Sequence, residues 1–195
     1  MGLFRSIRCL VVDDTEGALG RSAARNQAVE QADAEWLFFL DADDLMHPYA
    51  FKNFQPFEKG NDAVWGAIVE DKGGCMSPRY QVPTIDTFEQ LITYDPYLTL
   101  QMGHFVRTAI AQDRPFNENM NTGEDWEYYL RLWENDEIRC KKVNVPFMIN
   151  VRDQHSTGPR AATGQDWMKV VHALLEAKRA ELERVKALRQ SVAAA

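Results

Sequence analysis

The sequence predicts an α/β fold, in which helices pack against the faces of a sheet. Two apolar runs, IRCLVV (7–12) and WLFFL (36–40), have the length and composition of buried strands. Between them, alanines recur at every fourth position of AARNQAVEQA (23–32), which indicates a helix that lies close against a sheet. This order of strand, helix and strand is typical of layered α/β domains.

Length and composition favour one intracellular domain. The chain has 195 residues and a formal net charge of −7, which argues against a nucleic-acid partner because phosphate binding requires clustered Lys and Arg. We expect no signal peptide, because the first residues lack a long apolar stretch, and no segment approaches the ~20 apolar residues of a membrane span. Three widely separated cysteines without a CxxC pair favour reduced thiols and a cytoplasmic location.

The elements of the N-terminal half follow from caps and apolar runs. Ser22 can cap the alanine-rich helix, and the continuous apolar run of 36–40 predicts a strand buried on both faces. A short helix is expected after Pro48, followed by a third strand at 63–69. Residues 70–85 contain glycine and proline and predict an excursion from the core.

The C-terminal half begins with helix 86–94, a short strand near 98–106 and a helical turn after it. Thr122 is then expected to cap a strong amphipathic helix, and 140–151 alternates like a strand that Pro146 would place at a sheet edge. The last residues form a long charged helix, so we divide the chain into a domain of 1–164 and a C-terminal helix of 165–195. The apolar stripe of that helix comprises Trp167, Val171, Leu174, Leu175, Leu182 and Val185.

Three acids follow the strand 36–40 within four positions. In an open α/β sheet, ligands bind beyond the carboxyl ends of the strands, where Asp41, Asp43 and Asp44 lie. Clustered carboxylates repel one another unless a cation lies among them, and hard oxygen ligands suit Mg²⁺ or Mn²⁺. Two other interpretations stay open: a plain turn in which Asp44 caps a helix entering at Leu45, and a phosphatase of the haloacid-dehalogenase type with Asp41 as nucleophile.

Longer motifs around these acids favour one of these three interpretations. GRSAARNQAVEQADAEWLFFLDADDLMHP (20–48) resembles the central signature of family 2 glycosyltransferases with the GT-A fold. NENMNTGEDWEYYLRLWEND (117–136) looks like the family's second signature, an ED pair that opens a helix. VRDQHSTG (151–158) resembles the loop that follows. The resemblance implies a reduced GT-A fold, a mixed sheet flanked by helices with a long C-terminal helix.

The resemblance also implies roles for single residues. Asp43 matches the acid of the DxD motif that binds a divalent metal, and Asp41 the acid near the donor's ribose or the metal. Asp125 matches the catalytic base, with Glu124 beside it at a helix N-terminus, where negative charge is favoured. Arg25 matches the arginine that reaches toward the nucleotide.

Further candidates rest on residue type as well as on the resemblance. His155 is a candidate third metal ligand, because a neutral imidazole suits Mn²⁺ better than Mg²⁺. His104 and Trp126 are candidate contacts for the acceptor, although a tryptophan at this place more often belongs to the core.

The N-terminal region departs from the family pattern. Family members have two βα units before the ARN helix, and the second ends in an acidic turn that helps to hold the donor's base. Here about ten residues separate Asp14 from Arg25. If VVDD (11–14) is that acidic strand end, Asp13 contributes to donor binding and a helix and strand are missing after it. We favour the alternative that VVDDTEGALG (11–20) is the strand and loop just upstream of the ARN helix, and that the earlier units are absent.

These observations predict a metal-dependent, inverting glycosyltransferase that uses Mn²⁺ or Mg²⁺. It would transfer a sugar from a UDP- or GDP-linked donor to an acceptor hydroxyl. The alternative is a non-catalytic glycosyltransferase-like module that binds a sugar or nucleotide, or serves in assembly. The apolar stripe of the C-terminal helix also predicts a homo-oligomer.

Overall fold

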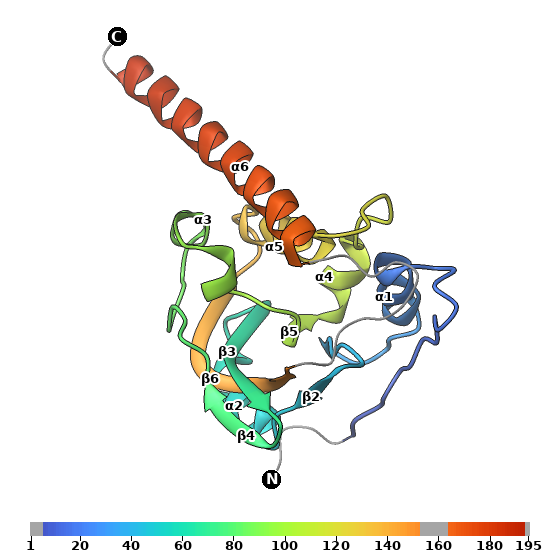
Figure 1. Ribbon diagram of the computed structural model, residues 1–195. Coiled ribbons are helices and arrows are strands. Elements are labelled where there is room, and N and C mark those ends of the chain that lie inside the picture. Colours follow the sequence, from blue (N-terminus) through green and yellow to red (C-terminus); the bar gives the residue numbers. More distant parts are fainter. Residues whose placement is uncertain (1–5, 153–163, 194–195) are drawn as a thin grey trace.

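The computed structural model describes residues 6–152 and 164–193 and shows a mixed α/β fold (Figure 1). The sheet has the strand order β1-β5-β3-β6-β2, with β4 paired to β3 outside this path. Only β3 and β6 pair in parallel among these strands; the other pairs are antiparallel. The strands are β1 (Trp36–Phe38), β2 (Asp44–Met46), β3 (Ala63–Lys72), β4 (Cys75–Pro78), β5 (His104–Arg107) and β6 (Cys140–Val151).

Helices lie on the sheet and extend from it, which confirms the predicted fold class. The long helix α6 projects from the body as a rod (Figure 1). The helices are α1 (Arg21–Glu30), α2 (Ala50–Phe54), α3 (Phe88–Thr93), α4 (Thr108–Asp113), α5 (Glu124–Trp133) and α6 (Gly164–Ala193), with the short 3₁₀ helices η1 (Gln55–Phe57) and η2 (Pro96–Leu98).

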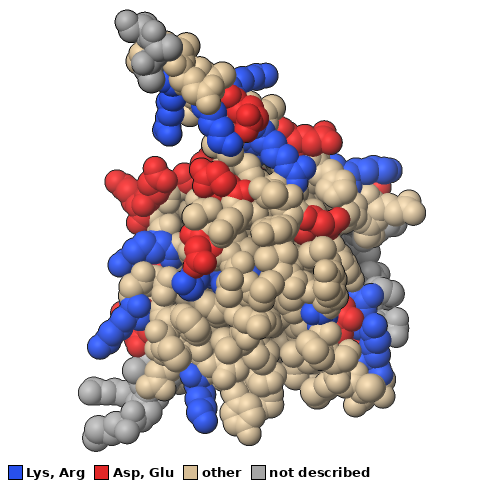
Figure 2. All heavy atoms as spheres, turned by 90° about the vertical axis from the view of Figure 1, so that its left-hand side faces the viewer, with Lys and Arg blue, Asp and Glu red and all other residues tan. Residues whose placement is uncertain are grey.

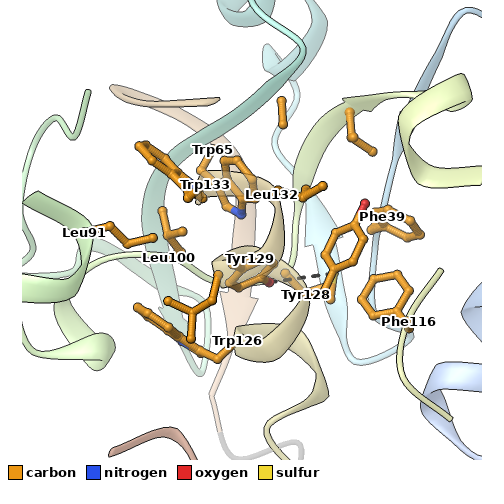
Figure 3. Packing of buried hydrophobic residues seen from close by; sticks show 14 of the residues in the cluster. Phe39, Trp65, Leu91, Leu100, Phe116, Trp126, Tyr128, Tyr129, Leu132 and Trp133 are labelled. Carbon is orange, nitrogen blue, oxygen red and sulfur yellow. Dashed lines mark hydrogen bonds between the residues drawn. The ribbon is translucent and has the colours of Figure 1, made fainter. Parts of the chain in front are cut away.

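Two hydrophobic cores form because successive side chains of β3 point to opposite faces of the sheet. Ala63 and Trp65 belong to the larger core, whereas Val64 belongs to the smaller one, which packs around Phe54 of α2. The larger core is rich in aromatic residues from α5 (Figure 3). The N-terminal half of α6 is part of this core, where Val171 and Leu175 are fully buried.

The pairing of β3 with β6 contains an irregularity that corrects one prediction. Pro146 does not mark an edge strand, because β6 lies between β3 and β2. The proline lies at a shift in the β3–β6 register, where the absence of its N–H is tolerated. Gly66 lies opposite this shift, and a Cβ there would come within 2.7 Å of the Val145 carbonyl oxygen. Glycine therefore permits the close approach of the two strands.

The predicted N-terminal strand is wrong. Residues 7–12 form neither strand nor helix, and the side chains of Ile7 and Val11 are exposed. The segment runs outside the sheet (Figure 1), whose edge strand β1 pairs only with β5 among the described strands. Because β1 is an edge strand, its residues are half-buried, and the prediction that 36–40 is buried on both faces is also wrong.

Both predicted helix caps are wrong as well. Ser22 lies inside α1, whose N-cap is Gly20, and the Asp14 carboxylate accepts hydrogen bonds from the N–H groups of Leu19 and Gly20. The N-cap of α5 is Gly123 in a left-handed conformation with φ 75°, one residue after Thr122. The N-terminal ends of these two helices are therefore organised by glycine geometry and loop contacts.

The segment 70–85 is more regular than predicted at its start. β3 continues through Lys72, and β4 returns along it as a hairpin whose residues are exposed. Four other predicted elements form as expected. They are α2 after Pro48, the third strand β3, helix α3 near 86–94 and strand β5 near 98–106.

The surface carries charges of both signs. In the view of Figure 2, blue and red atoms are interspersed along α6 and the periphery, and the central area is largely uncharged. None of the helices in the described part of the chain is long and apolar enough to cross a membrane. A cytoplasmic location remains a prediction from the sequence.

Candidate active site

The three acids lie where β1 connects to β2: Asp41 and Asp43 are in the connecting turn, and Asp44 is the first residue of β2. These three residues are called the acidic turn. The N–H of Asp44 donates to the carbonyl of Asp41 at 3.1 Å, which closes the turn. As a result, Asp41, Asp43 and Asp44 each present a carboxylate oxygen, and these atoms lie within 4.8 Å of one another. A turn, rather than a helix start, therefore gathers the three charges at one end of β1.

The interpretation that Asp44 caps a helix is wrong, because Asp44 and Leu45 are the first two residues of strand β2. Its carboxylate instead accepts hydrogen bonds from the Asn150 side chain at 2.9 Å and the Val151 N–H at 3.2 Å. Burial raises the pKa of Asp44 to about 6, with the Asn150 bond opposing and the charges of Asp41 and Asp43 adding to the rise. The Asp44 side chain thus fastens the acidic turn to β6.

Arg25 of α1 connects the acidic turn to α5. Its guanidinium donates to Asp41 at 2.8 Å and to Glu124 at 2.9 Å. The Arg25 side chain is 14% exposed and that of Glu124 only 5%, whereas that of Asp41 is 37% exposed. Burial alone would lower the pKa of Arg25, but the two carboxylates raise it, so the guanidinium stays charged. The buried guanidinium of Arg25 therefore connects the two sequence signatures of the resemblance, 20–48 and 117–136.

Asp125 is the second residue of α5 and is half-buried. Its Oδ1 accepts hydrogen bonds from the N–H of Trp126 at 2.9 Å and from the indole Nε1 of Trp167 at 3.1 Å. Burial, reinforced by the charge of Glu124, raises the pKa of Asp125 to about 6, while Arg25 and the two donors oppose the rise. A carboxylate with this pKa is ionised at neutral pH and is more basic than an ordinary aspartate.

The donor set of the acidic turn fits a hard divalent cation. Oxygen ligands from carboxylates are those that Mg²⁺ and Mn²⁺ accept, and a cluster of three leaves positions for water and phosphate oxygens. Asp41 is neutralised in part by Arg25, while Asp43 makes no ion pair with any described residue. Asp43 is therefore the carboxylate most in need of a cation. His155, the third predicted ligand, lies outside the described residues.

Three other candidates do not belong to the acidic turn. Asp13 is exposed, and its carboxylate accepts hydrogen bonds from the side chain and N–H of Thr15, which lower its pKa. The hydrogen bonds of Asp13 thus stay within its own loop. His104 and Trp126 are fully buried, so the prediction that they contact an acceptor is wrong. His104 stacks on Trp65 with ring centroids 4.6 Å apart, and burial lowers its pKa to about 3.

Comparison with known proteins identifies the family of this chain. The family model described as glycosyl transferase family 2 matches residues 4–106, more than half of the chain. The chain belongs to glycosyl transferase family 2. This family assignment, together with the fold, favours the glycosyltransferase interpretation of the acidic turn over a phosphatase.

Two of the similar proteins are named for polymers of a polyol phosphate. The chain is 26% identical over 167 residues to the poly(ribitol-phosphate) β-N-acetylglucosaminyltransferase TarP of Staphylococcus aureus, covering 80% of this chain and 50% of TarP. It is 28% identical over 152 residues to a teichoic acid poly(glycerol phosphate) polymerase of Staphylococcus epidermidis, covering 73% of this chain and 20% of that protein. The chain therefore spans half or less of the length of these relatives.

Solved structures of Staphylococcus aureus TarS share the fold. The structure of TarS residues 1–349 with UDP-GlcNAc matches with a TM-score of 0.59 at 20% identity, over 80% of this chain and 46% of that one. The same TarS fragment with UDP matches with a TM-score of 0.54 at 21% identity, over 68% and 40%. These similarities confirm the GT-A fold of this family 2 chain.

Sequence reasoning missed two residues that hold the site together. The sequence pattern places Trp167 only in the apolar stripe of the C-terminal helix, but its indole N–H donates a hydrogen bond to Asp125. Asn150 was one residue of an alternating strand, although its amide bonds Asp44 and accepts from Arg79. Neither contact has a sequence signal, since each joins residues 42 or more positions apart.

We expect Arg25→Met to destabilise the fold by about 3–5 kcal/mol, because it leaves the buried carboxylate of Glu124 without its ion pair. Adding Glu124→Gln to this variant removes the unpaired charge and recovers most of the loss. Adding Asp41→Asn instead recovers little, because water already solvates Asp41. Urea unfolding of the single and double variants measures these free energies. If Glu124→Gln and Asp41→Asn recovered the free energy of unfolding equally, the assignment of Glu124 as the buried partner would be contradicted.

Proposed function

We propose that this chain is the catalytic part of a metal-dependent, inverting glycosyltransferase. The observation that carries the proposal is the bridge from Arg25 to Asp41 and Glu124. It links the turn proposed to bind the metal to the start of α5, where the proposed base Asp125 follows Glu124, and transfer between a donor and an acceptor requires both groups. Membership of glycosyl transferase family 2 supports this assignment.

The proposed donor is a nucleoside-diphosphate sugar, with UDP preferred to GDP. The support comes from TarS, a protein of the same fold whose structures contain UDP-GlcNAc and UDP. The proposed acceptor is a hydroxyl group, and we expect it at the side of the site where Asp125 lies. Relatives named for ribitol-phosphate and glycerol-phosphate polymers make a polyol hydroxyl a suitable first acceptor to test.

Asp125 is the proposed base. Trp126 and Trp167 both bond its Oδ1, and no described residue bonds its Oδ2, so Oδ2 can take the acceptor's proton. The acceptor oxygen then forms a bond to the anomeric carbon as the bond from that carbon to the diphosphate oxygen breaks. Direct displacement inverts the configuration at this carbon. Glu124 is held by Arg25 and serves to position that cation rather than to move a proton.

Asp43 and Asp41 are the proposed metal ligands, with Asp44 beside them and His155 as a further predicted ligand. A divalent cation bound there would neutralise charge on the leaving diphosphate. Arg25 contributes a second positive charge at the same corner, on the side of Asp41. The carboxylates of Asp41 and Glu124 thus balance the charge of Arg25, and the carboxylate of Asp43 remains to bind the metal ion.

The first prediction of this proposal concerns donor binding. In calorimetric titrations, UDP should bind in the presence of Mn²⁺ and lose this binding when EDTA removes the metal. Asp43→Asn should weaken Mn²⁺-dependent binding about tenfold or more, because it removes a ligand. Asp136→Asn, which changes an exposed aspartate in the turn after the C-terminal end of α5, is the matched control and should bind UDP normally. No binding of UDP or GDP under any of these conditions would refute the donor assignment.

The second prediction concerns the base. Asp125→Asn should abolish sugar transfer while UDP binding with Mn²⁺ stays intact, because only proton acceptance is lost. In the wild-type chain, the rate should fall about tenfold per pH unit below pH 6, since protonation of Asp125 removes the base. Transfer rates from a UDP-sugar, measured between pH 4.5 and 8, test both statements. A variant that retains full activity would exclude Asp125 from this role.

We also propose that the chain associates with itself through the distal half of α6. Val185, Leu188 and Val192 follow one another at spacings of three and four residues and are 40%, 66% and 71% exposed. Such a stripe is the seam of a coiled coil, and burying it against a second copy removes apolar surface from water.

Replacing these three residues with serine should convert an oligomer into a monomer, because the apolar seam is lost while the core contacts of Val171 and Leu175 remain. Light scattering after size exclusion gives the molar mass. Glu183→Ser with Lys186→Ser, which removes an exposed ion pair from the same part of α6, is the control and should keep the oligomer. A monomeric wild-type chain at high concentration would contradict self-association.

A further inference from the structure

The indole of Trp167 makes a contact that its place in an apolar stripe does not explain. Its Nε1 donates to Oδ1 of Asp125 at 3.1 Å, across 42 positions of sequence. Trp167 lies in the first turn of α6, an element outside the signatures that suggested the site. The hydrogen bond therefore links α6 directly to the proposed base.

Comparison with the other tryptophans shows that this contact is specific. The chain has five tryptophans, and the indole N–H groups of Trp36, Trp65, Trp126 and Trp133 are buried without a partner among the described residues. Only the indole of Trp167 has a hydrogen-bond acceptor in the same part of the chain. Because an indole can only donate, its direction toward a carboxylate stabilises the ionised form of that carboxylate.

The backbone before α5 is shaped to let α6 approach. Gly123 adopts φ 75°, and a Cβ at this position would meet Cγ1 of Val170 at 2.7 Å. Val171, the next residue of α6, is fully buried in the larger core. The N-terminal part of α6 is thus seated against the start of α5, and Trp167 is presented to Asp125 from a fixed support.

We propose that Trp167 is a positioning residue, which holds Oδ1 of Asp125 so that Oδ2 faces the acceptor hydroxyl. This inference rests on the proposed role of Asp125 as the base. The N–H of Trp126 reaches the same Oδ1 from the adjoining backbone, so two donors from two helices fix one oxygen of the carboxylate. The carboxylate then has one orientation in which to accept a proton.

The charged groups that face Asp125 define the expected pH behaviour. Glu124 on the same helix raises its pKa, while Arg25 of α1 and the Trp167 N–H of α6 lower it. Removal of the N–H therefore raises the pKa of Asp125 further. The acidic limb of the pH–rate profile should move to higher pH, in the direction opposite to that for loss of Glu124.

Trp167→Phe tests the inference, because phenylalanine keeps an aromatic ring and removes only the donor. We expect kcat to fall about ten- to hundredfold, the range for losing one hydrogen bond to a charged group, with the donor KM unchanged. The acidic limb should shift to higher pH. Trp133→Phe is the matched control: it also replaces an indole that packs in the larger core, but one whose N–H has no described partner, and its pH profile should match the wild type.

A second measurement does not depend on activity. The indole ¹⁵N–¹H resonance of Trp167, identified by its loss in Trp167→Phe, should shift with pH around 6 in the full chain and stop doing so in Asp125→Asn. If this resonance does not respond to Asp125, or if Trp167→Phe leaves kcat and the pH profile unchanged, the inference is wrong. If the resonance responds but the wild-type chain transfers no sugar, the contact stands and the proposed function fails.

Discussion

The ion pairs of Arg25 are the interaction on which the rest of the site depends. This guanidinium contacts Asp41, 16 positions away, and Glu124, 99 positions away, so it ties three distant elements to one point. A buried charge is tolerated only where opposite charges and hydrogen bonds compensate it. The start of α5 and the acidic turn must therefore both approach α1, and electrostatics bring the acidic turn to the same guanidinium as Glu124.

The layer beneath this ion pair is aromatic. His104, whose pKa is lowered to about 3 by burial and by Arg25, stays neutral and stacks on Trp65. Tyr129 packs edge-on against both rings, and its own pKa is raised well above the usual range by burial. A core of this kind lets little water approach from below, which strengthens the electrostatic interactions above it. The raised pKa of Asp125 has the same origin, since burial is its main cause.

The parts of the fold predicted from the sequence are those that local patterns determine. The acids follow a short apolar strand, and the ED pair opens a helix, because both features depend on neighbours within a few residues. The prediction of a strand at 7–12 failed because an apolar run needs a partner strand, and no sequence rule supplies one. Pro146 suggested an edge, but the register shift beside Gly66 accommodates it inside the sheet. The contacts of Trp167 and Asn150 could not be predicted, because the periodicity of a helix or strand carries no information about hydrogen bonds to distant parts of the sequence.

The burial of Val171 and Leu175 has a consequence for how the chain acquires its structure. β1 pairs with β5, and β3 with β6, so most strand contacts join segments far apart in the sequence. Such contacts form slowly, since long loops must close before any pairing is rewarded. The larger core also receives side chains from α6. During synthesis on a ribosome, that core cannot be completed until residue 175 has emerged, so the part of the core that α6 covers stays exposed to solvent until then.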